Sequence, residues 1–277
     1  MGIPFAALCA ALLAATQPLQ PTAEAEQPAA EQAAAEEVSE DTAHGGAGVA
    51  PVELIPRIEL RHSFARLPGG VSASATTARL DVDFLRRVLL RYELPFMRVA
   101  NAAGEQISGL GDITLQAIGV VTSSPRQVVV LIAGAQFDTA SQPQLGQGKH
   151  VLLLGAAAGF RVRRWWLPYG IAQEQISVAG DDARPDINQL LLRAGNIVFG
   201  PGFAWLKLDV DGTIDFRDDA TTRLFASIEA GRLLIGRVGL FVRGGTQVVG
   251  PRQLDYTLEA GVRYLFRLGT KAPPPSP

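Results

Sequence analysis

Apolar and polar side chains alternate with a period of two along much of the chain, most clearly in the segment DYTLEAGVRYLF. Every second residue from Tyr256 to Phe266 is apolar, whereas Asp255, Glu259 and Arg263 fall on the other set. Successive side chains of a β-strand point to opposite faces, so this spacing predicts a strand with one apolar and one polar face. A helix would scatter the same residues around its circumference.

The same alternation recurs along the body of the chain. It is clearest in four other segments, residues 54–64, 80–94, 113–121 and 238–243. Clusters of Gly, Pro, Asn and Ser separate these segments, as is typical of turns. Asp211-Gly212 and Gly244-Gly245 are also predicted turns, because Asp-Gly favours a two-residue type I′ hairpin. No segment has the spacing of an amphipathic helix of three turns, so the body is predicted to be all-β.

The predicted strands are long for a soluble sheet. They recur about every 20 residues and run for about 9–14 residues, whereas soluble sandwiches turn every 8–12 residues. A tilted strand of about 9–11 residues crosses a hydrocarbon layer. We therefore predict a closed, antiparallel, up-and-down transmembrane β-barrel of about 10–12 strands, with apolar side chains toward lipid and polar ones toward a wet lumen. A soluble β-sandwich with half-exposed sheets is the competing interpretation.

The first fifty residues differ from this body. Residues 1–25 contain one ionisable side chain, Glu24, and an apolar stretch of signal-peptide length, which predicts a cleaved signal peptide. An unprocessed Ala-rich tail is the alternative. Residues 26–50 hold six acids, no Lys or Arg and no apolar side chain larger than Val, which predicts a disordered acidic linker. We assign residues 51–267 to the barrel and residues 268–277 to a disordered tail.

Charge and composition exclude several classes of protein. Residues 51–277 hold all 25 basic residues and 20 of the 27 acids, so the body has a net charge of +5, too small to predict a nucleic-acid partner. The single cysteine, Cys9, excludes a disulfide framework and a cysteine-built zinc site. With three histidines, the chain has few groups for metal binding. We expect neither a metal nor a cofactor.

Charged residues on the polar faces of the strands are the candidate lumen residues. They are Arg87, Arg91, Glu93, Asp112, Arg193, Glu229, Arg237, Arg243, Glu259 and Arg263. Charged rings tune the selectivity of a pore, and a body charge of +5 weakly favours anions. At this strand number the lumen can be an open pore, or it can be filled by ion-paired side chains.

The remaining motifs have structural interpretations. The GLGD sequence at residues 109–112 lacks the Lys-Ser/Thr of a phosphate loop, so its glycines are predicted to allow a tight turn. DVDGTID has its glycine at the wrong position for a calcium loop. His62 and Ser63 are neighbours in a strand and point to opposite faces, and His150 has no acidic partner nearby in sequence. We therefore expect no catalytic residues and no enzymatic activity.

A further signal comes from an ordered set of segments: LRYELPFMRV, SGLGDITLQAIGVV, LGQGKHVLLLGAAAGF, SVAGDDARPDINQLLL and GVRYLF. Over about residues 75–267 they resemble a bacterial outer-membrane β-barrel family named for the MetA pathway of phenol degradation, with related transporter-like barrels. The resemblance implies a Gram-negative outer-membrane location, contact with outer-membrane lipid, and passive transport or binding of small, hydrophobic or aromatic molecules.

The resemblance also implies folding by the barrel-assembly machinery, with Tyr264 and Phe266 as the candidate assembly signal. Residues 267–277 follow this signal, which departs from the family pattern of a terminal aromatic residue. Two other functions stay open on the sequence. One is a non-transporting structural or assembly barrel of the envelope, with the acidic linker as a periplasmic tether, and the other is an outer-membrane lipid hydrolase.

Overall fold

The computed structural model describes residues 49–85, 87–235 and 237–266, which fold into thirteen β-strands and three short 3-10 helices. The strands are β1 (Arg57–Arg66), β2 (Ser72–Leu85), β3 (Val88–Ala100), β4 (Gln106–Leu110), β5 (Ile113–Ser123), β6 (Gln127–Phe137), β7 (Lys149–Phe160), β8 (Trp166–Gly180), β9 (Asn188–Phe199), β10 (Ala204–Asp215), β11 (Thr221–Ile235), β12 (Val238–Val249) and β13 (Tyr256–Leu265). The helices are η1 (Pro68–Gly70), η2 (Pro143–Leu145) and η3 (Pro201–Phe203). The predicted signal peptide, the linker up to residue 48 and the tail lie outside the described residues. Within the described ranges, no helix is long and apolar enough to cross a membrane.

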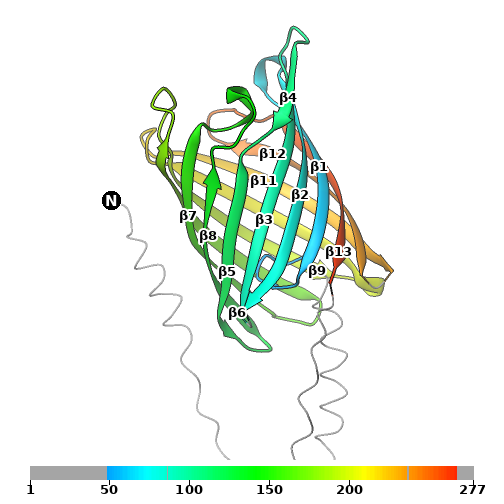
Figure 1. Cartoon of the computed structure of the whole chain (residues 1–277). Coiled ribbons are helices and arrows are strands. Elements are labelled where there is room, and N and C mark those ends of the chain that lie inside the picture. The colour runs from blue at the N-terminus through cyan, green and yellow to red at the C-terminus, as the bar shows by residue number, and fades with distance from the viewer. Residues whose placement is uncertain (1–48, 86, 236, 267–277) are drawn as a thin grey trace, which may run out of the picture. The chain divides into compact units, whose positions relative to one another are not determined.

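The strands form one closed antiparallel sheet, which Figure 1 shows as a tilted barrel. Strand β1 pairs with both β2 and β13, and this closes the sheet on itself. Strand β4 pairs with residues 96–100 of β3, and β5 pairs with residues 88–93 of the same strand. Because β4 and β5 together occupy one position, the barrel has twelve strand positions. The predicted fold is confirmed, at the upper end of the predicted strand number.

The two ends of the barrel differ. Strand β1 begins and β13 ends at one end, where the Phe266 N–H donates a hydrogen bond to the Pro56 carbonyl (2.9 Å). We call this the terminal end and the opposite one the loop end. Connections at the terminal end are short, such as the turn between β2 and β3, whereas the β6–β7 connection at the loop end spans residues 138–148. In bacterial outer-membrane barrels the short turns are periplasmic and the longer loops are extracellular.

Apolar side chains cover the outside of the barrel. Leu60 and Val262 lie opposite each other on β1 and β13, and both are exposed. Leu258 and Tyr264, on the same face of β13, are 57% and 39% exposed. A soluble sandwich would bury these side chains in its core, so the structure rules out that interpretation. An outward apolar surface around a closed barrel is a surface for lipid.

Glycines inside the barrel lie opposite aromatic rings of the next strand. The pairs are Tyr169–Gly195, Trp205–Gly231 and Phe241–Gly261. A Cβ atom at Gly231 would lie 2.2 Å from Cζ2 of Trp205. Glycine is therefore required at these positions because the ring lies flat against the neighbouring backbone.

Two of the predicted turns are wrong, because they lie inside strands. Asp211-Gly212 is in the middle of β10, and Gly244-Gly245 is in the middle of β12. A Cβ atom at Gly245 would lie 2.3 Å from Cζ of Phe225, so ring packing explains this glycine. Asp211 forms an ion pair with Arg193 of the adjacent strand, which explains an acid at that position.

The GLGD sequence is also not a tight turn. Gly109 and Leu110 are the last residues of β4, and Gly111 and Asp112 form the short break before β5; both strands run along β3. Neither Gly109 nor Gly111 has a positive φ. A Cβ atom at Gly109 would lie 2.1 Å from Oγ of Ser141, and one at Gly111 would lie 2.7 Å from Sδ of Met97. Close packing against these neighbours is the physical reason for both glycines.

Candidate functional site

An apolar cluster lies in the lumen at the terminal end. Residues 49–55, which we call the plug segment, precede β1 and lie inside the barrel. Val49, Ala50 and Val52 are 6%, 0% and 2% exposed, and they pack in one cluster with inward side chains of β3 and β5–β13. The barrel residues of this cluster are Leu89, Ile118, Val130, Ile132, Ala157, Leu167, Tyr169, Ile197, Phe199, Trp205, Leu233, Phe241 and Leu265.

We call this cluster the apolar septum. It draws on ten of the thirteen strands, so it extends around nearly the whole circumference of the barrel at the terminal end. The sequence assigned Val49 and Ala50 to the linker, whereas both are buried in this cluster. The first strand of the barrel wall begins at Arg57, and the plug segment precedes it. The physical reason for the burial is that Val49 and Val52 find a complementary apolar surface inside the barrel, which the sequence of the segment does not reveal.

A charged cavity of about 360 Å³ lies next to the septum, on the side of the loop end. Its cationic lining residues are Arg57, Arg61, Arg79, Arg91, Arg193, Lys207, Arg243 and Arg263. Its acidic lining residues are Glu59, Glu93, Glu229 and Glu259. Three further acids, Asp81, Asp209 and Asp211, pair with these cations. Eight cations therefore face seven acids, an excess of one positive charge.

Asp81 is the centre of one ion-pair cluster. Its carboxylate is 1% exposed and lies 3.2 Å from Nε of Arg57, 2.6 Å from Nη2 of Arg79 and 3.0 Å from Nε of Arg91. Arg61 forms further ion pairs in the cavity, since it lies 3.3 Å from Glu93 and 4.0 Å from Glu259. Three guanidinium groups are thus held together by a single buried carboxylate.

A second cluster connects the cavity to the septum. Lys207 lies 3.2 Å from Asp209 and 3.7 Å from Glu229. The indole N–H of Trp205 donates to Glu229 (2.9 Å), and the Arg263 guanidinium lies 5.2 Å from the centre of the Trp205 ring. Aromatic rings at the edge of the septum therefore contact the charged residues directly, which ties the two layers together.

The charges are confined to one part of the cavity wall. Strands β5–β8 contribute Gln116, Ile132, Ile171 and Gln173 to the lining, none of them charged. The charged residues all come from β1–β3 and β9–β13. The lumen therefore has a charged wall facing an uncharged one.

Most of the predicted lumen residues lie in this cavity. Those that line it are Arg91, Glu93, Arg193, Glu229, Arg243, Glu259 and Arg263. Asp112 points inward near the loop end but organises the β6–β7 loop instead. It accepts hydrogen bonds from the backbone N–H groups of Thr139 (3.2 Å), Ala140 (3.1 Å) and Gln147 (2.7 Å).

Arg87 and Arg237 are not among the residues that line the charged cavity. Both lie in the tight turns of the terminal end, β2–β3 and β11–β12, and both are exposed. Arg87 lines a different cavity of that end, together with Leu54 and Val120. The alternation assigned them to the polar face because it does not show where one strand ends and the next begins. Ion-paired residues that were not singled out include Arg57, Asp81 and Lys207. The period-two spacing places Arg57 and Asp81 on the polar faces of their strands, so these two lumen residues could have been predicted from the sequence.

The two described histidines lie away from the cavity. His62 is exposed on the outside of β1 and its Nδ1 hydrogen-bonds to Oγ1 of Thr76 (2.9 Å). Nδ1 of His150 accepts from the Asp138 N–H at the loop end (3.3 Å). Among the residues that the structure describes, no group of three or more His, Cys, Asp or Glu side chains is arranged to hold a metal ion. Tyr264 and Phe266 pack edge to face on the outer surface with ring centres 5.3 Å apart; their role in assembly stays a prediction.

Glu53 holds the plug segment in a tight turn. Its Oε2 accepts hydrogen bonds from the N–H groups of Val49 (3.0 Å) and Ala50 (3.4 Å), and its own N–H donates to the Ala50 carbonyl (3.1 Å). Its Oε1 is buried and has no hydrogen-bond partner among the described residues. Burial raises the pKa of Glu53 from 4.5 to about 7, against the opposing effect of Arg57 and Arg161.

Comparison with known proteins supports the barrel fold but does not show a family for this chain. No family model matches the chain, and no curated protein matches it in sequence. Similar solved structures include an outer membrane channel from Pseudomonas putida F1, with a TM-score of 0.63 and 14% identity over 77% of this chain and 96% of that one. Two porins are also similar. The NanC porin has a TM-score of 0.57 and 8% identity, over 75% of this chain and 98% of that one. The KdgM porin in complex with disordered oligogalacturonate has a TM-score of 0.55 and 8% identity, over 76% of this chain and 99% of that one.

At these identities the likeness shows the fold alone. It is the fold of outer-membrane β-barrels, as the sequence predicted. The specific resemblance to the MetA family is not shown by these comparisons and stays a prediction.

Proposed function

We propose that the protein is a channel of the Gram-negative outer membrane, in which small solutes bind and pass without chemical change. The observation that supports this function is a charged cavity enclosed by a barrel whose outer surface is apolar. Charged and polar groups that line a lumen replace part of the hydration of a solute, and this lowers the cost of entering a pore. The short turns assign the terminal end, and with it the septum, to the periplasmic side.

The septum requires that such a channel have two states. With the plug segment docked, the apolar layer blocks water and ions at the terminal end. The segment is held by burial of Val49, Ala50 and Val52 and by the hydrogen bonds of its own turn, with no covalent link to the wall in the described residues. Displacement of these few residues toward the periplasm opens a continuous path.

The charge of the cavity also indicates which class of solute the channel carries. An excess of one positive charge favours small anions over cations of similar size. The resemblance noted in the sequence adds hydrophobic or aromatic molecules as a second proposed cargo class. The uncharged wall of β5–β8 is compatible with these molecules, whereas the charged wall favours polar ones.

Recordings from planar lipid bilayers test the proposal. We expect discrete openings of the full-length protein, separated by long closed periods, with a reversal potential in a KCl gradient that shows modest selectivity for chloride. A protein that inserts, migrates as a heat-modifiable barrel and never conducts would contradict the channel function. The septum favours one alternative in that case, a non-transporting structural barrel.

The open fraction of such a channel is expected to rise with pH. The docked plug favours the protonated form of Glu53, since burial raises its pKa from 4.5 to about 7. This contribution to docking is fully present below pH 4.5 and is lost as the pH rises through about 7. Each unit of pKa difference changes the equilibrium about tenfold, so we expect up to about a hundredfold more opening.

The measurement is the open fraction of single channels between pH 4.5 and pH 8. The Glu53→Gln variant keeps an acceptor for the two N–H groups and cannot ionise, so its open fraction is expected to stay constant. An identical pH profile in this variant would assign the effect to another group.

A further inference from the structure

A second cavity, separate from the charged one, lies between the plug segment and the barrel wall at the terminal end. It has a volume of about 400 Å³. Its apolar lining residues are Val52, Leu54, Ile55, Val120, Val128 and Leu167. Its polar residues come from the plug segment and from the β5–β6 and β7–β8 turns. A cavity of this size and character is in the range that binds small organic molecules.

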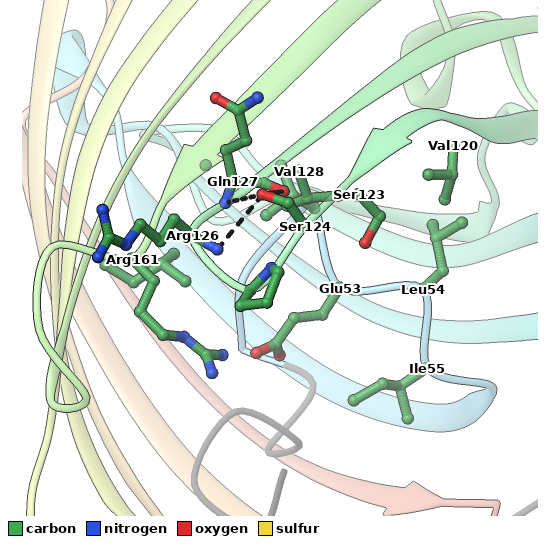
Figure 2. Close-up of a pocket in the computed structure, with 14 residues that line it drawn as sticks. Glu53, Leu54, Ile55, Val120, Ser123, Ser124, Arg126, Gln127, Val128 and Arg161 are labelled. Carbon is green, nitrogen blue, oxygen red and sulfur yellow. Dashed lines mark hydrogen bonds between the residues drawn. The ribbon is translucent and has the colours of Figure 1, made fainter. Parts of the chain in front are cut away.

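The two arginines and three of the apolar side chains of this cavity lie on different sides. Figure 2 shows Arg126 and Arg161 on one side, Leu54, Ile55 and Val120 on the other, and Glu53 between them. The arginines belong to two successive turns at the terminal end and are joined through the backbone, since the Arg161 N–H donates to the Arg126 carbonyl (2.7 Å). An amphipathic ligand fits this division.

The two guanidinium groups set the charge of the ligand. Within the described part of the chain, neither Arg126 nor Arg161 forms an ion pair with an acidic side chain, in contrast to the paired arginines of the charged cavity. Arg126 is exposed and Arg161 is half-buried. Of the two, Arg161 points toward the one carboxyl group of the cavity, Glu53, whose Oε1 is buried without a partner among the described residues.

We propose that this cavity binds a small amphipathic monocarboxylate, whose carboxylate contacts Arg126 and Arg161 and whose hydrocarbon part lies on Leu54, Ile55 and Val120. Guanidinium groups form strong, charge-assisted hydrogen bonds to carboxylates. Protonated Glu53 donates its Oε1 proton to the ligand carboxylate, which gives that buried atom a partner. The ligand contacts the plug segment directly, so its binding and the position of this segment are coupled.

Binding to the full-length protein in nanodiscs of zwitterionic lipid tests this site, with octanoate, octanol and octylamine as probes in isothermal titration calorimetry. These probes share one hydrocarbon chain and differ in the head group. We expect octanoate to bind at least tenfold more tightly than octanol, and octylamine to bind least. Octanol binding as tightly as octanoate, octylamine binding best or an absence of octanoate binding would each overturn the proposal.

Variants locate the site. The Arg126→Gln/Arg161→Gln double variant is expected to weaken octanoate binding at least tenfold and to leave octanol binding unchanged. The matched control is Arg163→Gln, since Arg163 is an exposed arginine of the same β7–β8 connection that does not line the cavity. An equal loss in the control would overturn the assignment. Heat-modifiable migration of each variant shows that its barrel has formed.

Two further measurements separate this site from its alternatives. Ile55→Asn is expected to weaken octanoate and octanol binding by the same factor, because it changes only the hydrocarbon part of the site. Octanoate is expected to bind more tightly at pH 6 than at pH 8, and Glu53→Gln removes this difference. Loss of octanoate binding when phosphatidylglycerol is added to the bilayer would assign the cavity to a lipid head group and overturn the proposal. Neither result depends on conductance, so the site and the channel function can fail separately.

Discussion

Oxidation of a Val52→Cys/Gly159→Cys variant is expected to abolish channel openings, and reduction with dithiothreitol is expected to restore them. A Cβ atom at Gly159 would lie 2.8 Å from Cγ2 of Val52, so the two side chains are adjacent across the septum. A disulfide requires Cβ atoms about 3.5–4.5 Å apart, which small side-chain adjustments can provide here. The bond would fix the plug segment to β7 and prevent its displacement.

The experiment uses a Cys9→Ser background, so that only the introduced cysteines can pair. Each single-cysteine variant is a control and is expected to conduct in both redox conditions. If the oxidised double variant still conducts as well as the reduced one, ions do not pass through the septum. The plug segment would then not be the gate.

Replacement of Asp81 is expected to have the largest effect on stability. Asp81→Asn leaves Arg57, Arg79 and Arg91 clustered without the carboxylate that all three contact at 2.6–3.2 Å. Removing one member of a buried ion-pair cluster costs about 3–5 kcal/mol, because the remaining charges are uncompensated. The measurement is urea unfolding of the barrel in lipid vesicles. The same change adds one positive charge to the lumen, so we also expect stronger anion selectivity.

Asp182→Asn is the matched control, because Asp182 is an exposed acid in the β8–β9 loop. Its effect on the free energy of unfolding is expected to stay within about 0.5 kcal/mol. Equal unfolding of Asp81→Asn and the wild type would show that lumen water, rather than Asp81, stabilises the three guanidinium groups.

The fold was predictable because its main determinant is local. Period-two alternation assigns Leu258 and Val262 to one face and Glu259 and Arg263 to the other, and a strand has only two faces. Closure into a barrel then decides which face meets lipid. Strand boundaries were harder to predict, since Gly244-Gly245 is a glycine pair like those of turns and only the Phe225 ring shows why it lies in a strand.

The candidate site was only partly predictable for the same reason. Membership of the polar face follows from spacing, and seven of the ten predicted residues line the charged cavity. Which acid pairs with which arginine depends on the register between strands, such as the alignment of Arg57 with Asp81. The plug segment was missed because Val49, Ala50 and Val52 follow an acidic linker-like sequence, and their burial depends on inward residues of ten distant strands.

The apolar septum also affects how many copies of the protein a cell can tolerate in its outer membrane. A permanently open pore makes the envelope leakier in proportion to its abundance, which limits how much of it is tolerated in the presence of toxic compounds. A barrel whose periplasmic mouth is closed by its own chain adds little permeability until the moment of displacement. For a channel that works as proposed, expression can therefore rise without a matching loss of resistance to harmful solutes outside the cell.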